Sequence, residues 1–170
     1  MKTLLVIASL FTILTVNAQT KQLDVGDTVP KFTLLNQDGK PFNMKDSIGK
    51  KVIVIFFYPK DESIVCTKEA CAFRDSSSAL IKAGALVVGI NQGSVESHKK
   101  FATDDNLPYQ LLSDPDERVI AAFGVKGKMY TDRVTYVVDK TGQIVFKYHS
   151  LTEGKKHTDE VLKFLREMKQ

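Results

Sequence analysis

The residues that could do chemistry gather in one stretch of the chain, which reads YPKDESIVCTKEACAFRD from Tyr58 to Asp75. Cys66 lies just beyond an apolar run typical of a buried strand, where a helix is predicted to begin. The first N–H groups of a helix have no partner within it, and with the helix dipole they favour a thiolate over a thiol. Ser63 adds a hydroxyl donor, and Pro59 fixes the direction of the chain as it leaves the strand. This arrangement predicts an activated sulfur at Cys66.

A second cysteine, Cys71, follows five residues later on the same predicted helix. Positions five apart in an intact helix differ by about 7.5 Å of rise and about 140° of rotation, which places their Cα atoms roughly 8.7 Å apart. A disulfide needs Cα atoms within about 7 Å of each other. The two cysteines can therefore bond only if the first helical turns unwind. The spacing favours a disulfide that opens and closes with a local conformational change over a permanent structural one.

The elements that must position these cysteines follow from the hydrophobic pattern. Continuous apolar runs over 52–57 and 85–90 predict two buried strands, and residues 66–81 between them carry apolar side chains at helical spacing. Strand, helix and strand in this order predict a βαβ unit with parallel neighbouring strands.

Flanking segments complete a single domain. Turn residues and capping residues predict further strands at 31–36, 41–44, 111–112, 134–138 and 144–146, and further helices at 94–104, 118–123 and from Thr158 onward. This order indicates an α/β domain with a central mixed sheet and helices on both faces, in a thioredoxin-like layout with an added N-terminal β-hairpin.

Composition narrows the classes of function. The chain has 170 residues, of which 43% are hydrophobic and 26% charged, and a formal net charge of +4. These values exclude a disordered chain and a multi-span membrane protein, and the interleaved charges form no nucleic-acid-binding face. Two cysteines are too few for a four-thiolate zinc site, and His98, His149 and His157 lack ligand spacing. No metal, haem or nucleotide cofactor is expected.

The first eighteen residues resemble a secretory signal peptide. Lys2 precedes a mostly apolar run, and Val16-Asn17-Ala18 is typical of a small-residue cleavage site. The run is shorter than the roughly 20 residues that span a bilayer. We therefore expect a signal peptide over 1–18, a domain over 19–170 with no membrane attachment after cleavage, and export to the periplasm or the exterior, where disulfides persist.

Together these motifs resemble the peroxiredoxins of the Q type, the bacterioferritin-comigratory-protein group. The family pattern of Pro, three residues, Thr or Ser, two residues and Cys is matched by Pro59, Ser63 and Cys66. CTKEACAFRD is similar to the helix of that group, with the second cysteine at the same offset. The resemblance extends through SVESHKKF, LLSDPD and RVTYVVDKTG and covers essentially all of 19–170.

The resemblance implies a thiol-dependent peroxidase. Cys66 matches the peroxidatic cysteine, Cys71 the resolving cysteine, Ser63 the hydroxyl donor and Arg133 the active-site arginine. The substrates implied are hydrogen peroxide and organic hydroperoxides, and the reductant is a thioredoxin-like protein. Because intramolecular resolution needs no second subunit, a monomer is expected. The chain departs from the group where Ser63-Ile64-Val65 replaces the usual Thr-Pro-Gly.

Three other functions stay open from the residues alone. An exported thioredoxin-like dithiol oxidoreductase acting on proteins normally has two residues between its cysteines, whereas this chain has four. A copper chaperone of the same fold has three residues between them and a distal histidine. A secreted domain whose cysteines form a static disulfide would have no enzymatic activity.

Overall fold

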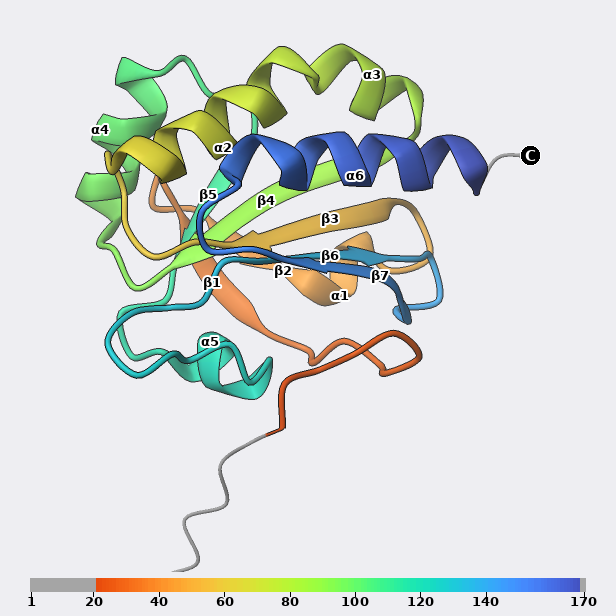
Figure 1. Cartoon of the computed structure of the whole chain (residues 1–170). Coiled ribbons are helices and arrows are strands. Elements are labelled where there is room, and N and C mark those ends of the chain that lie inside the picture. Colours follow the sequence, from red (N-terminus) through yellow and green to blue (C-terminus); the bar gives the residue numbers. More distant parts are fainter. Residues whose placement is uncertain (1–20, 169–170) are drawn as a thin grey trace, which may run out of the picture.

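Seven strands form one mixed sheet in the computed structural model, which describes residues 21–168 (Figure 1). Their order across the sheet is β2-β1-β5-β4-β3-β6-β7. The strands are β1 (Thr33–Asn36), β2 (Pro41–Asn43), β3 (Val52–Phe57), β4 (Ala85–Asn91), β5 (Gln110–Ser113), β6 (Val134–Val138) and β7 (Ile144–His149). The predicted mixed sheet and the predicted N-terminal hairpin of β1 and β2 are confirmed.

The centre of the sheet is the strand that leads to the cysteines. All six residues of β3 are buried, as its unbroken apolar sequence predicts. The strand pairs parallel with β4 and antiparallel with β6, so the predicted βαβ unit is confirmed. Side chains of β3 alternate between two cores: Ile53 and Ile55 pack on one face, and Val54 and Phe56 on the other.

Helices cover both faces of the sheet (Figure 1). Figure 1 shows α2, α3 and α6 on one face, and α1 and α5 on the other. The helices are α1 (Met44–Ser47), α2 (Ile64–Asp75), α3 (Ser77–Lys82), α4 (Val95–Asp104), α5 (Arg118–Ala122) and α6 (Gly154–Glu167). None of the helices over residues 21–168 is both long and apolar enough to cross a membrane.

Two helix predictions are wrong. Residues 66–81 do not form one helix, because α2 ends at Asp75 and α3 begins at Ser77, and Ile81 is 71% exposed. Three consecutive serines, residues 76–78, are weak helix formers and allow this break. Thr158 does not start the last helix either, since α6 begins at Gly154 and Thr158 is buried within it. The predicted signal peptide lies outside the described residues.

Candidate active site

Cys66 lies in the first turn of α2, as predicted. Ser63 is the N-cap residue, and the N–H of Thr67 donates to the Ser63 carbonyl at 2.8 Å. The N–H groups of residues 64–66 therefore precede the first intrahelical hydrogen bond and remain available to a ligand. The Cys66 side chain is only 1% exposed and packs in the core under α2. The chain thus holds a buried sulfur at the positive end of a helix.

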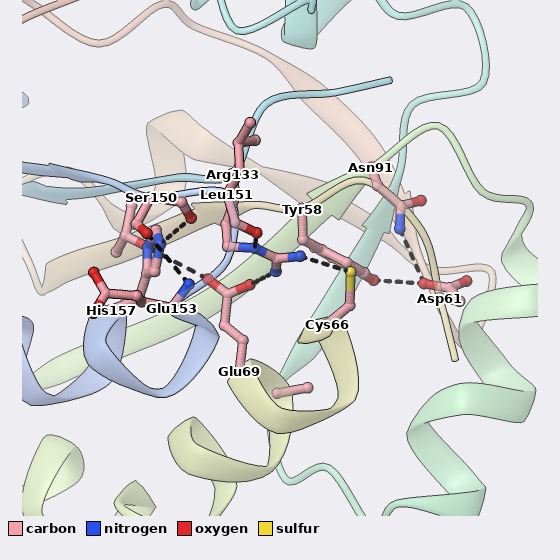
Figure 2. A network of polar contacts seen from close by, with 12 residues as sticks. Tyr58, Asp61, Cys66, Glu69, Asn91, Arg133, Ser150, Leu151, Glu153 and His157 are labelled. Carbon is pink, nitrogen blue, oxygen red and sulfur yellow. Dashed lines mark hydrogen bonds and ion pairs between the residues drawn. The ribbon is translucent and has the colours of Figure 1, made fainter. Parts of the chain in front are cut away.

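Arg133 contacts the sulfur of Cys66. It directly precedes β6, and its Nη2 donates to Cys66 Sγ at 3.1 Å (Figure 2). The same guanidinium forms an ion pair with Glu69 through Nη1 and donates from Nε to the Leu151 carbonyl at 3.1 Å. The side chain is almost completely buried, so these partners fix its orientation. A guanidinium held in this way stabilises negative charge on the sulfur.

Glu69 and His157 form a second layer behind Arg133 (Figure 2). Glu69 is fully buried one helical turn after Cys66, and its Oε1 lies 3.5 Å from His157 Nδ1. His157 also contacts the Thr135 hydroxyl through Nδ1 at 2.8 Å and the Ser150 carbonyl through Nε2 at 3.0 Å. Because a carbonyl oxygen can only accept, Nε2 carries the proton.

Burial shapes the protonation of this layer. It lowers the pKa of His157 to about 4, so the imidazole is neutral near pH 7. It also raises the pKa of Glu69 to about 8, whereas Arg133 acts in the opposite direction by stabilising the carboxylate. The Arg133 guanidinium is therefore shared between the sulfur of Cys66 and a carboxyl group whose charge is disfavoured by its surroundings.

The loop from β3 to α2 is anchored by a buried carboxylate, Asp61. Its oxygens accept hydrogen bonds from the Tyr58 hydroxyl at 2.7 Å, from Asn91 Nδ2 at 3.0 Å and from Ser97 Oγ at 2.5 Å. His98 Nδ1 lies 2.8 Å from the same carboxylate. Figure 2 shows the contacts of Tyr58 and Asn91 with Asp61. Because the partners of Asp61 come from the ends of β3 and β4 and from α4, they fix the loop that carries Pro59 and Ser63.

Two other predicted site residues lie on this loop. Pro59 and Ser63 are both half-buried. Ser63 is the N-cap of α2, yet its hydroxyl does not cap a backbone N–H of the helix. Among the described residues, the hydrogen bond to Cys66 Sγ comes from Arg133 rather than from Ser63.

Cys71 lies further along α2 and is half-buried. Both cysteines are free, and α2 is continuously helical between them, as the predicted open form requires. The Cys71 thiol donates to Asp105 Oδ1 at 3.6 Å, at the end of α4. Burial raises the pKa of the Cys71 thiol, the Asp105 carboxylate raises it further and Arg74 lowers it. In this state Cys71 is a protonated thiol that binds the Asp105 carboxylate.

Several of these residues could not be assigned from the sequence. A glutamate on a helix such as Glu69 is as often solvated as buried, and histidines that lack ligand spacing, such as His98 and His157, carry no local sign of a site. All three are buried and hydrogen-bonded or ion-paired. The signal for Asp61 was present but weak: an acidic residue between an apolar strand and a reactive cysteine. Over residues 21–168, no group of three acidic, histidine or cysteine side chains could hold a metal ion.

A buried cysteine at a helix start, contacted by a buried arginine, on a mixed α/β sheet defines a protein with an activated thiol. Residues 25–147 match the model of the AhpC/TSA family. The chain belongs to this family and is a peroxiredoxin.

Curated relatives and solved structures agree with this assignment. Peroxiredoxin Q from the chloroplast of Sedum lineare is 46% identical over 147 residues, which cover 85% of this chain and 78% of the relative. The chloroplastic peroxiredoxin Q of Arabidopsis thaliana is 46% identical over 148 residues, 85% of this chain and 68% of the relative.

Among solved structures, peroxidoxin BcpB of Mycobacterium tuberculosis superposes with a TM-score of 0.83 at 34% identity, over 88% of this chain and 100% of that one. The bacterioferritin comigratory protein of Xanthomonas campestris, studied for its alkyl peroxide reduction activity, superposes with a TM-score of 0.75 at 29% identity, over 82% of this chain and 92% of that one. The predicted thioredoxin-like fold is confirmed.

The comparisons correct one prediction and weaken the alternatives. Export to the periplasm or the exterior is wrong by this comparison, since the plant relatives are chloroplastic proteins. An apolar N-terminal run reports hydropathy, and hydropathy alone does not define a compartment. A dithiol oxidoreductase acting on proteins is not favoured, because the relatives named above are peroxiredoxins.

Proposed function

We propose that this peroxiredoxin reduces hydrogen peroxide and organic hydroperoxides with Cys66 as the peroxidatic cysteine. The contact that carries the proposal is the Arg133 guanidinium 3.1 Å from the sulfur in the first turn of α2. The alkyl peroxide activity of the Xanthomonas campestris relative supports the wider substrate range. Residues 19–170 act as one monomeric catalytic domain, preceded by a leader over residues 1–18.

In the first step the Cys66 thiolate attacks the terminal oxygen of the peroxide. A sulfur–oxygen bond forms, the oxygen–oxygen bond breaks, and the departing oxygen takes the electron pair and then a proton from solvent. Arg133 and the N–H groups of residues 64–66 stabilise the charge that moves onto this oxygen, and Ser63 supplies a further hydroxyl donor. Cys66 becomes a sulfenic acid, and water or an alcohol leaves.

In the second step Cys71 resolves the sulfenic acid. The first turns of α2 unwind, the sulfur of Cys71 attacks that of Cys66, and the disulfide forms as water departs. A thioredoxin-like protein then reduces this disulfide by dithiol exchange and restores both thiols. Pro59 stiffens the approach to the helix, so that unwinding is confined to α2 itself.

Stopped-flow peroxide consumption, with a thioredoxin-like protein as the electron donor, tests this function. Wild type should turn over continuously with either hydrogen peroxide or an alkyl hydroperoxide. Cys66→Ser should consume no peroxide above background, and Cys71→Ser should be oxidised once per chain and then stall. Steady turnover by Cys66→Ser would refute the assignment of the peroxidatic cysteine, and turnover by Cys71→Ser equal to wild type would refute that of the resolving cysteine.

A further inference from the structure

The middle of α2 is tied to a short segment that follows α4. The thiol of Cys71 donates to the Asp105 carboxylate at 3.6 Å, and Arg74 Nη1 donates to the Asp105 carbonyl at 2.8 Å. Four residues later, the Tyr109 hydroxyl donates to the Ala70 carbonyl at 2.7 Å. We call residues 105–109 the α2 tether. These contacts hold the part of the helix that carries Cys71.

The first turn of α2 has different anchors. Cys66 and Glu69 are held by Arg133, which precedes β6. Ser63 makes no side-chain cap, and Ile64 is 77% exposed. The two cysteines are therefore fastened to two separate parts of the fold, and bringing them together must break one of these attachments.

We propose that Asp105 is a positioning residue for the resolving step: it holds Cys71 in the wound helix as a thiol and so sets the lifetime of the sulfenic acid at Cys66. This inference rests on the peroxidase function proposed above. The step that Asp105 delays is the reaction of the Cys71 thiol with the Cys66 sulfenic acid, in which a sulfur–sulfur bond forms, the sulfur–oxygen bond breaks and water leaves with both protons.

Electrostatics gives Asp105 this effect. Ionising Cys71 in the wound helix would place a thiolate directly beside a carboxylate, in a half-buried site where their repulsion is poorly screened. The other charged or titratable groups that face Cys71 are Arg74 and Asp75 from α2 and Tyr109 from the tether. Arg74 favours the thiolate, but it also binds the Asp105 carbonyl and so strengthens the tether.

Unwinding α2 removes this restraint. Once Cys71 leaves Asp105, its sulfur enters water without a neighbouring carboxylate, and a larger fraction is the thiolate that attacks. Cys71 is thus an unreactive thiol while Cys66 meets peroxide and becomes a nucleophile when the helix opens.

Three single substitutions separate charge from tethering. Asp105→Asn keeps an oxygen acceptor and removes the charge, and Tyr109→Phe removes only the hydroxyl that binds the Ala70 carbonyl. Asp104→Asn is the matched control, because Asp104 is the exposed neighbouring acid and pairs with Lys100. Rapid mixing with one equivalent of hydrogen peroxide, across a series of pH values, resolves the oxidation of Cys66 from the later formation of the disulfide.

Asp105→Asn should leave the oxidation phase unchanged, speed the disulfide phase by about threefold to tenfold and move its pH midpoint downward. Tyr109→Phe should speed the disulfide phase with no change in its pH midpoint, and Asp104→Asn should match wild type. A disulfide phase in Asp105→Asn with the rate and pH dependence of wild type would overturn the inference.

A second measurement does not depend on peroxidase activity. In the Cys66→Ser background, the pH dependence of Cys71 alkylation by iodoacetamide reports the ionisation of that thiol alone. Adding Asp105→Asn should move its midpoint to lower pH, and adding Asp104→Asn should not. If wild type consumes no peroxide while this shift is found, the proposed function fails but the electrostatic effect of Asp105 stands; an unchanged midpoint overturns the role of Asp105.

Discussion

Arg133→Met removes the guanidinium that contacts the sulfur of Cys66. Methionine is a flexible apolar side chain that can fill much of the buried space, but it has no N–H donor. The variant loses the hydrogen bonds to Cys66 Sγ and to the Leu151 carbonyl, and it loses the ion pair with Glu69. Catalysis and stability should therefore both suffer, for different reasons.

The loss of catalysis follows from the donor at the reacting centre. Removing one preorganised donor from a site where charge develops costs about 2.7–4 kcal/mol, or about 10²- to 10³-fold in rate. We expect kcat/KM for hydrogen peroxide to fall by about that factor. Arg133→Lys keeps the charge but not the planar guanidinium that binds Cys66 and Glu69 together. Its kcat/KM should therefore lie between those of wild type and Arg133→Met.

The loss of stability comes from the Glu69 carboxyl group, which stays buried without its ion-pair partner. Arg133 and Glu69 are both buried, and removing one member of a buried ion pair costs about 3–5 kcal/mol. The pKa of Glu69 is raised to about 8 by burial even with Arg133 beside it, and removing the guanidinium raises it further. The stability gap to wild type should therefore shrink as pH falls toward 8, by at most about 1.4 kcal/mol per pH unit, and stay constant below that pH.

A double variant separates the two effects. In Arg133→Met/Glu69→Met no charged group is stranded, and apolar replacement of a whole buried ion pair is often neutral. Urea unfolding followed by circular dichroism should show that the double variant recovers most of the lost stability. Stopped-flow assays should show that its activity stays as low as that of Arg133→Met. Activity in either variant within threefold of wild type would refute the role of Arg133, and a double variant no more stable than Arg133→Met would refute the stranded-carboxyl argument.

Two further predictions concern the packing around the site. A Cβ at Gly154 would lie 2.5 Å from the Val65 carbonyl oxygen, so Gly154→Ala should lower the free energy of unfolding by about 1–3 kcal/mol in urea titrations. The control Lys155→Ala, at an exposed position, should not lower it. Equal stability of the two variants would contradict this prediction. Burial lowers the pKa of His157 from 6.5 to about 4, so the neutral ring stabilises the fold fully above pH 6.5 and this contribution is lost as pH falls toward 4. The difference in unfolding free energy between wild type and His157→Gln should therefore shrink by up to about 3 kcal/mol across this range. A difference that is independent of pH would show that His157 does not titrate as argued.

The sheet could be predicted because its strands carry a strong local signal. The unbroken apolar runs of β3 and β4 have no polar face, so they fit only strands buried on both sides. The position of Cys66 followed from the same signal, since the helix must start soon after β3 ends. Both conclusions depend on residues close together in the sequence, for which the hydrophobic pattern predicts the local backbone structure directly.

The second layer of the site could not be predicted in this way. Glu69, Arg133 and His157 come from α2, from the start of β6 and from α6, and no local pattern links residues so far apart. Arg133 was assigned to the site through the family resemblance. Glu69 could be considered as a residue that orients the arginine, but its burial and that of His157 became visible only in the fold. Their burial depends on pairing, which hydropathy does not record.

Helix boundaries were predicted less well than helix faces. The apolar spacing across 66–81 continues through Ser76, where the backbone of α2 nevertheless ends. The start of α6 at Gly154 depends on the close approach of this residue to the Val65 carbonyl, a contact between distant segments. Weak helix formers therefore allow the break between α2 and α3, whereas packing between distant segments accompanies the start of α6.

Mass spectrometry of the reduced protein, before and after one equivalent of hydrogen peroxide, tests the central claim most directly. Wild type should lose two hydrogens, and peptide mapping should join Cys66 to Cys71; Cys71→Ser should instead gain one oxygen on Cys66. An oxygen found on Cys71, or a Cys66 that stays reduced while peroxide is consumed, would contradict the account.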